Sequence, residues 1–400
     1  MSEWKKVRLG ELCDFINGGA WSDKEYAPEG IPVLKVTNCK NSGFSLSELS
    51  YLPHSLEQKY IQNKLQRNDV IIATVGSHPN LVNSSAGRSV IVNSFVEGFY
   101  LNQNAVCIRT KDEEILDQLF WGYYSKYYLF QNYIQMRGKG AANQMRIAIS
   151  AIKNYPMPLP PINVQRHIAS ILSRYDSLIE NYQKQIKLLE EAAQRLYKEW
   201  FIDLHFPGHE NTKIVDGLPE GWERKKVGEI AIISAGGDKP DVVTEEQTTE
   251  CQVPIYSNGT TKEGLYGYTN KSSNTAGSIT VSARGSIGFA CLRMHDYFSI
   301  VRLISIKPQN NVDLMYLFQF TKVHTFMSNG AAQQQLTVPM VKAIDVVYPA
   351  ESLLEAFENV VLPLYKKVQS LQSQLRLLTE ARDRLLPKLM SGEIKIESLN

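Results

Sequence analysis

The chain has 400 residues, a formal net charge of +2 and hydrophobic residues at 43% of its positions. This length allows two or three domains, each with its own core. Neither half of the sequence is strongly basic, so bulk charge alone does not indicate a nucleic-acid partner. No apolar run of about 18 residues and no N-terminal signal pattern occur, which predicts a soluble, cytoplasmic protein.

The cysteines are odd in number and scattered, and none are spaced as C-x-x-C. This pattern argues against a disulfide framework or a zinc site and fits a reducing cytosol. We expect all five to serve as ordinary packing residues; they are Cys13, Cys39, Cys107, Cys251 and Cys291.

The first 155 residues predict a module of short strands. Alternating apolar residues and glycine punctuation indicate strands within Gly30–Val36, Asp69–Gly76, Gly87–Phe95 and Asn104–Thr110. An aromatic-rich amphipathic helix is predicted over Leu119–Ile134. Its rings could form a platform for stacked bases, but their helical spacing favours packing in a core.

A long helix follows the proline-marked break at Tyr155–Pro161, where proline removes backbone donors and restricts the preceding residue. Residues Asn163–Phe201 contain no glycine or proline, and their apolar positions step by three and four. Such stepping predicts a coiled-coil seam. The seam residues are Ile168, Ile171, Tyr175, Tyr182, Ile186, Leu189 and Leu196.

The sequence then starts again. Leu218–Ile230 repeats the pattern of Trp4–Glu11, and the pair Gly236-Gly237 repeats Gly18-Gly19 at the same spacing. A second set of short strands and a second aromatic-rich helix follow. The strands are predicted within Cys251–Gly259, Gly277–Leu292 and Phe298–Ile306, the helix over Leu314–Met327, and Asn329–Ile344 echoes Gly138–Ile152.

A second long helix is predicted from Glu351 and copies the first, position by position. Its seam residues are Phe357, Val360, Leu364, Leu371, Leu375, Leu378 and Leu385. Two like helices are natural partners for each other, so we expect an α+β fold with two globular modules separated by an antiparallel coiled coil and related by an approximate two-fold axis. A helix of about 36 residues spans roughly 54 Å, so the pair could set a distance.

Four motifs in this order resemble the specificity subunit of a Type I restriction-modification system. They are the paired module starts, the helix entry "PLPPINVQRHIASIL" (Pro158–Leu172), the helix end "LLEEAAQRLYKEWF" (Leu188–Phe201) and "RDRLLPKLMSGEI" (Arg382–Ile394). The resemblance implies target-recognition domains at residues 1–155 and 218–350. It also implies a central helix at 156–204, a linker at 205–217, and a distal helix and tail at 351–400.

The resemblance further implies a DNA-binding subunit without catalysis of its own. Each domain of such a subunit reads one half of a split, asymmetric DNA sequence. Two methyltransferase subunits bind around the coiled coil and methylate adenine, and restriction subunits add ATP-dependent translocation and cleavage. S-adenosylmethionine, ATP and Mg are therefore expected on partner subunits, and no cofactor or metal is expected on this chain.

Two other classes of protein, an enzyme and an interaction scaffold without DNA, are alternatives to this interpretation. For an enzyme, the sequence lacks the N-P-P-Y or D-P-P-Y tetrapeptide of adenine methyltransferases and the glycine-rich phosphate loops. His205 and His209 have metal-ligand spacing, but Pro207 lies between them and interrupts a helix. For an interaction scaffold, the shared framework with divergent strand-loop segments is unexpected, whereas two readers of different half-sites predict it.

The candidate DNA contacts lie in polar and basic loops, since loops on a rigid scaffold carry most binding residues and such side chains read base edges. The Gly-Ala-Ala loops present in both modules could equally be structural turns. In the first module we favour Lys35, Thr37, Asn38, Lys40, Ser77, His78, Asn80, Arg88, Arg137, Lys139, Asn143 and Gln144. In the second we favour Tyr256, Asn258, Lys262, Arg284, Ser286, Gln333 and Gln334.

Overall fold

The computed structural model describes residues 4–40, 43–46, 49–77, 85–141, 144–326 and 335–394. The chain divides into two compact units. The first comprises residues 1–183 and 373–400, and the second comprises residues 184–372. Each unit therefore contains one globular module together with a part of each long helix, and the predicted α+β fold is confirmed.

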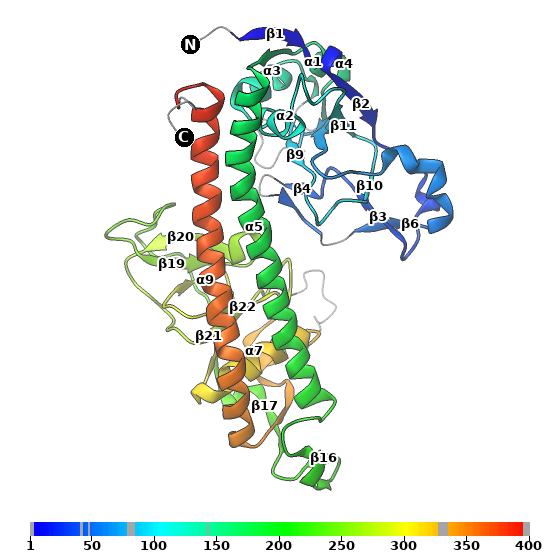
Figure 1. Cartoon of the computed structure of the whole chain (residues 1–400). Coiled ribbons are helices and arrows are strands. Elements are labelled where there is room, and N and C mark those ends of the chain that lie inside the picture. The colour runs from blue at the N-terminus through cyan, green and yellow to red at the C-terminus, as the bar shows by residue number, and fades with distance from the viewer. Residues whose placement is uncertain are drawn as a thin grey trace. The chain divides into compact units, whose positions relative to one another are not determined.

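The first module is built on several small, separate sheets (Figure 1). The strands predicted from the sequence are present, although several are shorter than expected. One four-stranded sheet has the order β2 (Cys13–Asn17), β11 (Ala105–Thr110), β7 (Val70–Ala73), β9 (Ser89–Ile91). A three-stranded sheet has the order β10 (Tyr100–Leu101), β3 (Ile31–Leu34), β6 (Ser50–Leu52), and β1 (Lys5–Arg8) pairs with β14 (Pro156–Leu159).

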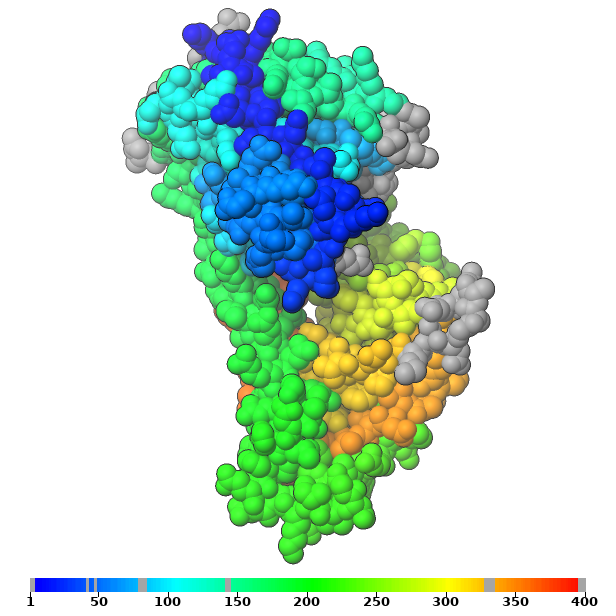
Figure 2. Space-filling view, turned by 90° about the vertical axis from the view of Figure 1, so that its right-hand side faces the viewer, coloured from blue at the N-terminus to red at the C-terminus, as the bar shows by residue number. Residues whose placement is uncertain are grey.

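Smaller elements complete this module. The third sheet has the order β12 (Lys139–Ala141), β13 (Gln144–Arg146), β8 (Val75–Gly76), and β4 (Cys39–Lys40) pairs with β5 (Gly43–Phe44). The helices are α1 (Leu9–Leu12), α2 (Gln118–Tyr124), α3 (Tyr128–Gln135) and α4 (Ile149–Lys153), with short 3-10 turns at η1 (Asp23–Glu25), η2 (His54–Leu56) and η3 (Gln58–Asn63). Residues of the blue part of the chain, which includes η1 to η3, form much of the first unit's surface in Figure 2.

The single helix predicted over Leu119–Ile134 is wrong, because α2 and α3 are separate helices. Ser125 Oγ donates a hydrogen bond to the Gly122 carbonyl at 2.7 Å, and the Gln131 side chain donates one to the Ser125 carbonyl at 2.6 Å. These bonds satisfy polar groups at the break.

The aromatic side chains of α2 and α3 lie in the core. Trp121 is fully buried and meets Phe130 edge to face, with ring centroids 5.2 Å apart. Tyr123 and Tyr124 are also buried. Core packing, which the sequence favoured over base stacking, is therefore confirmed for these rings.

The second module repeats the first. Its four-stranded sheet has the order β18 (Ala231–Ala235), β24 (Ile304–Pro308), β21 (Ser278–Val281), β22 (Ala290–Arg293). Its three-stranded sheet has the order β20 (Leu265–Thr269), β19 (Val253–Tyr256), β23 (Phe298–Ser299), and β17 (Glu223–Lys226) pairs with β25 (Asp345–Tyr348). The helices are α6 (Val227–Ile230), α7 (Leu314–Val323) and α8 (Val338–Lys342), and a hairpin of β15 (Ile214–Val215) and β16 (Leu218–Pro219) precedes them.

The long helices are α5 (Ile162–Tyr197), which continues into a π-turn at Lys198–Ile202, and α9 (Glu351–Met390). They run antiparallel. In the first unit Asp176 of α5 is ion-paired with Arg382 of α9, whereas in the second unit Phe201 meets Phe357 with ring centroids 4.9 Å apart. The predicted antiparallel pairing is confirmed.

Only some of the predicted seam positions are buried, and the first helix also buries residues outside the predicted seam, such as Leu172, Ile179 and Tyr197. Ile168, Phe357 and Leu371 are buried. Val360 was predicted in the seam but is 48% exposed, because the buried stripe steps from Phe357 by four residues to Val361 and then to Tyr365. The other predicted seam residues are half-buried: Ile171, Tyr175, Tyr182, Ile186, Leu189, Leu196, Leu364, Leu375, Leu378 and Leu385. Among the described residues no helix is both long and apolar enough to cross a membrane.

Candidate nucleic-acid interface

Asn258 joins two of the segments predicted to contact DNA in the second module. Its Oδ1 accepts a hydrogen bond from the Ala283 amide at 2.7 Å, and its Nδ2 donates one to the Val301 carbonyl at 2.7 Å. Tyr256–Lys262 and Ser282–Ser286 therefore lie side by side. Both polar atoms of Asn258 are used within the protein, which makes its side chain a support for the loops.

A third predicted segment joins this surface through Arg284. Its Nη2 donates a hydrogen bond to Gln335 Oε1 at 2.8 Å, and the Leu336 amide donates one to the Ala283 carbonyl at 2.9 Å. Arg284 and Ser286 are exposed, as is Lys262 on the neighbouring loop. The loop surface of the second module, as this surface is called below, thus combines exposed cations with a framework of internal hydrogen bonds.

Arg293 lies beneath this surface and is only 2% exposed. Its guanidinium carbon lies 3.6 Å from the centroid of the Tyr256 ring, and its nitrogens bond to Thr280 Oγ1 at 2.9 Å and to the Glu263 carbonyl at 2.6 Å. Tyr256 is itself buried, and its hydroxyl lies 3.0 Å from His295 Nε2. Burial raises the pKa of Tyr256, so the hydroxyl stays protonated.

Arg293 also fixes a strained turn. Lys262 and Glu263 have φ values of 48° and 54°, in the left-handed region that residues other than Gly, Asn and Asp rarely adopt. Glu263 Oε2 lies 3.2 Å from Arg293 Nη1, and its Oε1 accepts a hydrogen bond from Gln372 at 3.2 Å. These contacts hold the turn that carries the exposed side chain of Lys262.

In the first module, the predicted segment Lys35–Lys40 is shaped by Asn38. This buried side chain accepts a hydrogen bond from the Lys35 amide at 3.0 Å and donates one to the Ser45 carbonyl at 3.1 Å. Arg88 donates to the Cys39 carbonyl, so a second predicted residue supports the same loop. Lys35 bonds to Ser50 Oγ at 2.7 Å, whereas Thr37 and Lys40 are exposed and available to a partner.

The predicted segments Thr74–Asn80 and Arg137–Gln144 of this module approach each other, because β8 pairs with β13 and β13 pairs with β12. Arg137 is exposed and lies over the Tyr133 ring, with 3.5 Å from its guanidinium carbon to the centroid. Lys139 is exposed on β12, and Ser77 is half-buried. His78, Asn80, Asn143, Gln333, Gln334 and the side chain of Gln144 lie outside the described residues, so their DNA contacts stay predictions.

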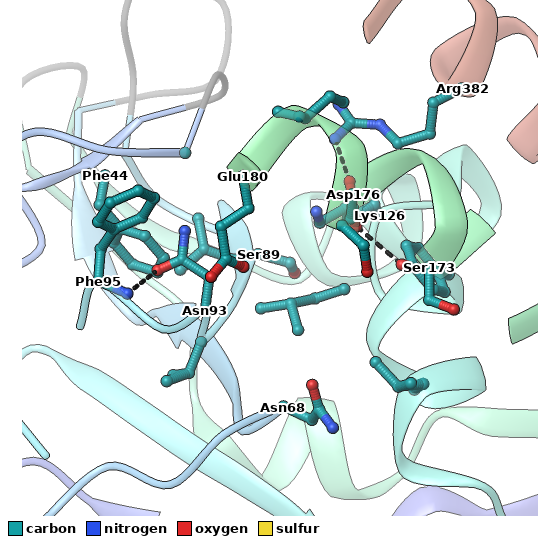
Figure 3. Close-up of a pocket in the computed structure, with 18 of the residues that line it drawn as sticks. Phe44, Asn68, Ser89, Asn93, Phe95, Lys126, Ser173, Asp176, Glu180 and Arg382 are labelled. Atoms are coloured by element: carbon teal, nitrogen blue, oxygen red, sulfur yellow. Dashed lines mark hydrogen bonds and ion pairs between the residues drawn. The ribbon is translucent and has the colours of Figure 1, made fainter. Parts of the chain in front are cut away.

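A cavity of about 810 Å³ lies in the first unit, between the β9 side of the module and the two long helices (Figure 3). Its acidic side chains have basic partners. Glu180 lies 2.8 Å from Arg67, and Asp176 lies 2.6 Å from Arg382. Lys126 also lines the cavity, and burial lowers its pKa. The Arg67–Glu180 pair fastens the module to α5, and the Asp176–Arg382 pair joins α5 to α9.

The cysteine and histidine side chains singled out in the sequence form no reactive or metal-binding cluster in the described part of the chain. The cysteine thiols are buried, as predicted for packing residues, and burial raises the pKa of Cys13, Cys39 and Cys291 to about 12. The His205 and His209 rings lie 5.5 Å apart, yet no group of three or more metal-ligating side chains occurs among the described residues. The arrangement suits binding through loops.

The sequence prediction missed one exposed cation, Arg302. It follows Val301, whose carbonyl bonds to Asn258, so it borders the loop surface of the second module. Phe298–Ile306 was interpreted as one strand because its residues favour β-structure. In the structure β23 ends at Ser299, β24 begins at Ile304 and a turn separates them. The pair Gly236-Gly237 was a signal for this turn, since both of its carbonyls accept hydrogen bonds from it.

Comparison with known proteins identifies the family that has this architecture. The family model for the Type I restriction modification DNA specificity domain matches residues 1–191 and 219–352. The chain belongs to this family. It is 27% identical over 274 residues to the specificity subunit of the type I restriction enzyme MjaIX of Methanocaldococcus jannaschii, a match covering 62% of this chain and 63% of the relative.

Two matches that cover nearly the whole chain lead to the same family. The putative type I restriction enzyme MjaX specificity subunit of the same organism is 21% identical, over 99% of this chain and 95% of the relative. The crystal structure of a type I restriction-modification S subunit from M. genitalium shares the fold, with a TM-score of 0.61, 22% identity and 96% coverage of both chains. The motifs predicted a specificity subunit, and this assignment is confirmed. The chain therefore belongs to a class of subunit that is distinct from the catalytic subunits.

Proposed function

We propose that this specificity subunit directs a type I methyltransferase and restriction complex to a bipartite, asymmetric DNA motif. Each module reads one half-site through its loops. The observation that carries this proposal is the duplicated framework: both modules have a four-stranded sheet, a three-stranded sheet and a strand pair of equivalent order, whereas their exposed loop side chains differ. Equal scaffolds with different loops suit two readers of different sequences.

The exposed cations and small polar side chains of both modules can form hydrogen bonds and ionic contacts with duplex DNA. Lys40, Lys139, Lys262 and Arg284 can contact phosphates or guanine, and Thr37 and Ser286 can bond to several base edges. The supports Asn38, Asn258 and Arg293 hold the loops in one conformation, and Asn38 and Arg293 are buried. A preorganised loop loses less conformational entropy on binding, which favours discrimination between sequences.

The paired helices are proposed to set the gap between half-sites. Helix α5 has 36 residues and α9 has 40, and both remain continuous through both compact units. A continuous helix changes length in fixed increments of about 1.5 Å per residue. The gap in the DNA motif is then a property of the helices and the half-sites a property of the modules.

The catalytic steps are assigned to partners. Two methyltransferase subunits and the restriction subunits complete the complex in the cytoplasm, and S-adenosylmethionine, ATP and Mg bind to those subunits. This proposal rests on the family and on the chemistry of the described residues, in which burial raises the pKa of Cys13, Cys39 and Cys291 and the acidic groups of the first unit's cavity are ion-paired.

Selection from random duplexes tests DNA recognition directly. The chain assembled with its methyltransferase is mixed with a random pool, and the bound duplexes are sequenced over several rounds. Enrichment of two short sequences at a constant separation supports the proposal. Enrichment of no sequence, with the assembled complex intact, supports the alternative of a scaffold that does not bind DNA.

A further inference from the structure

Two consecutive residues of the second module have backbone conformations that their side chains disfavour. Val301 and Arg302 have φ values of 54° and 64°. The left-handed region is uncommon for any residue except glycine, and for a β-branched residue such as valine it is a genuine outlier. Val301 is also 45% exposed, so burial of its side chain does not explain the conformation.

The turn is held by backbone contacts rather than by its own side chains. The Val301 amide donates to the Gly237 carbonyl at 2.9 Å, and the Arg302 amide donates to the Gly236 carbonyl at 2.8 Å. A Cβ on Gly236 would lie 2.7 Å from the Ile300 nitrogen, so this close approach requires glycine. The Val301 carbonyl accepts from Asn258, which ties the turn to the loop surface of the second module.

The first module contains the same turn with different residues. The Gln103 amide donates to the Gly19 carbonyl at 2.9 Å, as the Val301 amide does to Gly237. A Cβ on Gly18 would lie 1.9 Å from the Asn102 carbonyl oxygen, which repeats the glycine requirement. Here the residue with positive φ, at 74°, is Asn104, a type that tolerates this region well.

The two modules differ in the residue that occupies this left-handed position. At the position where the first module has asparagine, the second has an exposed arginine in the same left-handed conformation. Asparagine or glycine at residue 302 would relieve the strain without changing the turn. Strain that the surrounding structure maintains is characteristic of binding and active sites.

We propose that Arg302 contacts a base of the second half-site, donating two hydrogen bonds to the O6 and N7 atoms of a guanine in duplex DNA. A planar guanidinium matches this pair of acceptors, and the fixed turn limits where it can reach. This assignment rests on the proposed function of the two modules as readers.

Arg302→Asn tests the proposal, because asparagine keeps the left-handed turn and removes the guanidinium. The variant is assembled with its methyltransferase and compared with Arg224→Asn, which removes the same charge from exposed strand β17 of the same module. We expect the thermal midpoint of Arg302→Asn to equal or exceed that of the unmodified chain. We expect its affinity for the unmodified chain's motif to fall about 10-fold to 100-fold, and one guanine position of the second half-site to become relaxed.

Three outcomes separate the possibilities. Unchanged affinity and unchanged second half-site would overturn the assignment of Arg302. An equal loss on the motif and on unrelated duplexes would also overturn it, because it indicates a phosphate contact. If the unmodified complex enriches no sequence, the proposed function itself fails instead. Arg224→Asn should alter neither half-site.

Discussion

Arg382 Nη1 lies 2.6 Å from Asp176 Oδ1, although 206 residues separate them in the sequence. The other carboxylate oxygen of Asp176 accepts a hydrogen bond from the Tyr123 hydroxyl at 2.8 Å. One carboxylate of α5 therefore connects the distal helix with helix α2 of the first module. The Arg382 side chain is 15% exposed, so solvent screens this pair less than a surface ion pair.

Replacing Arg382 with methionine should destabilise the first unit. The change leaves a partly buried carboxylate without its cation, which costs roughly 1–3 kcal/mol of unfolding free energy. Urea unfolding followed by fluorescence measures it. Arg384→Met is the control, because Arg384 is exposed and pairs with Glu380 on the same helix face, so its loss should cost about 0.5 kcal/mol or less. Equal costs for the two variants would contradict the role given to Arg382.

Arg293→Met should loosen the turn at Lys262–Glu263. The substitution keeps the side-chain bulk and removes the contacts to Thr280 and Glu263. We expect relaxed discrimination in the second half-site and an unchanged first half-site, measured by sequencing methylated sites. Changes in both half-sites would show that Arg293 acts on the fold as a whole.

A second substitution in the Arg293→Met background separates positioning from simple stability. Glu263→Asn and Glu263→Gln both remove the carboxylate, but only asparagine tolerates a φ of 54° well. We therefore expect Glu263→Asn to restore discrimination and Glu263→Gln to leave it relaxed. If both restore it, the backbone conformation is not what Arg293 maintains.

Trp121→Ala should destabilise the first module by about 3–5 kcal/mol, since the ring is fully buried against Phe130. Met136 on the neighbouring segment is 83% exposed, so Met136→Ala should cost about 0.5 kcal/mol or less. Chemical denaturation distinguishes the two. A small cost for Trp121→Ala, together with weaker DNA binding, would favour the stacking platform that the structure argues against.

Much of the fold follows from the sequence because its signals are local or repeated. Alternation located the strands, and the copied stripe located both long helices. The break at Ser125 was missed because aromatic residues continue across it, and it depends on the side chain of Gln131, six residues further along the chain. The turn at Val301 was missed because valine and isoleucine favour strands, whereas contacts from Gly236 and Gly237 impose the turn.

The site was predicted less completely than the fold. Asparagine and arginine both read bases and support loops, so residue type could not separate Asn258, which supports a loop, from the exposed Arg284. Only tertiary contacts make that distinction. The sequence did select the right neighbourhoods in the second module, since three predicted segments meet there through Asn258, Ala283 and Gln335.

Lengthening the helices should change the gap and nothing else. Four residues inserted after Glu190, matched by four after Lys367, add about 6 Å and about 40° of rotation to both helices. Six ångströms is close to two base pairs, so the gap should grow by about one or two base pairs while both half-sites stay the same. Four residues inserted after Gly208, in an exposed turn outside the helices, should leave the gap unchanged. Altered half-sites with a constant gap would contradict the role of the helices.

Sequencing adenine methylation across the genome of cells that carry this chain and its methyltransferase tests the central claim most directly. Two different modules on paired helices predict a bipartite, non-palindromic motif with two unlike half-sites and one constant gap. A continuous motif, or a palindromic one in which both half-sites are the same, would contradict the account.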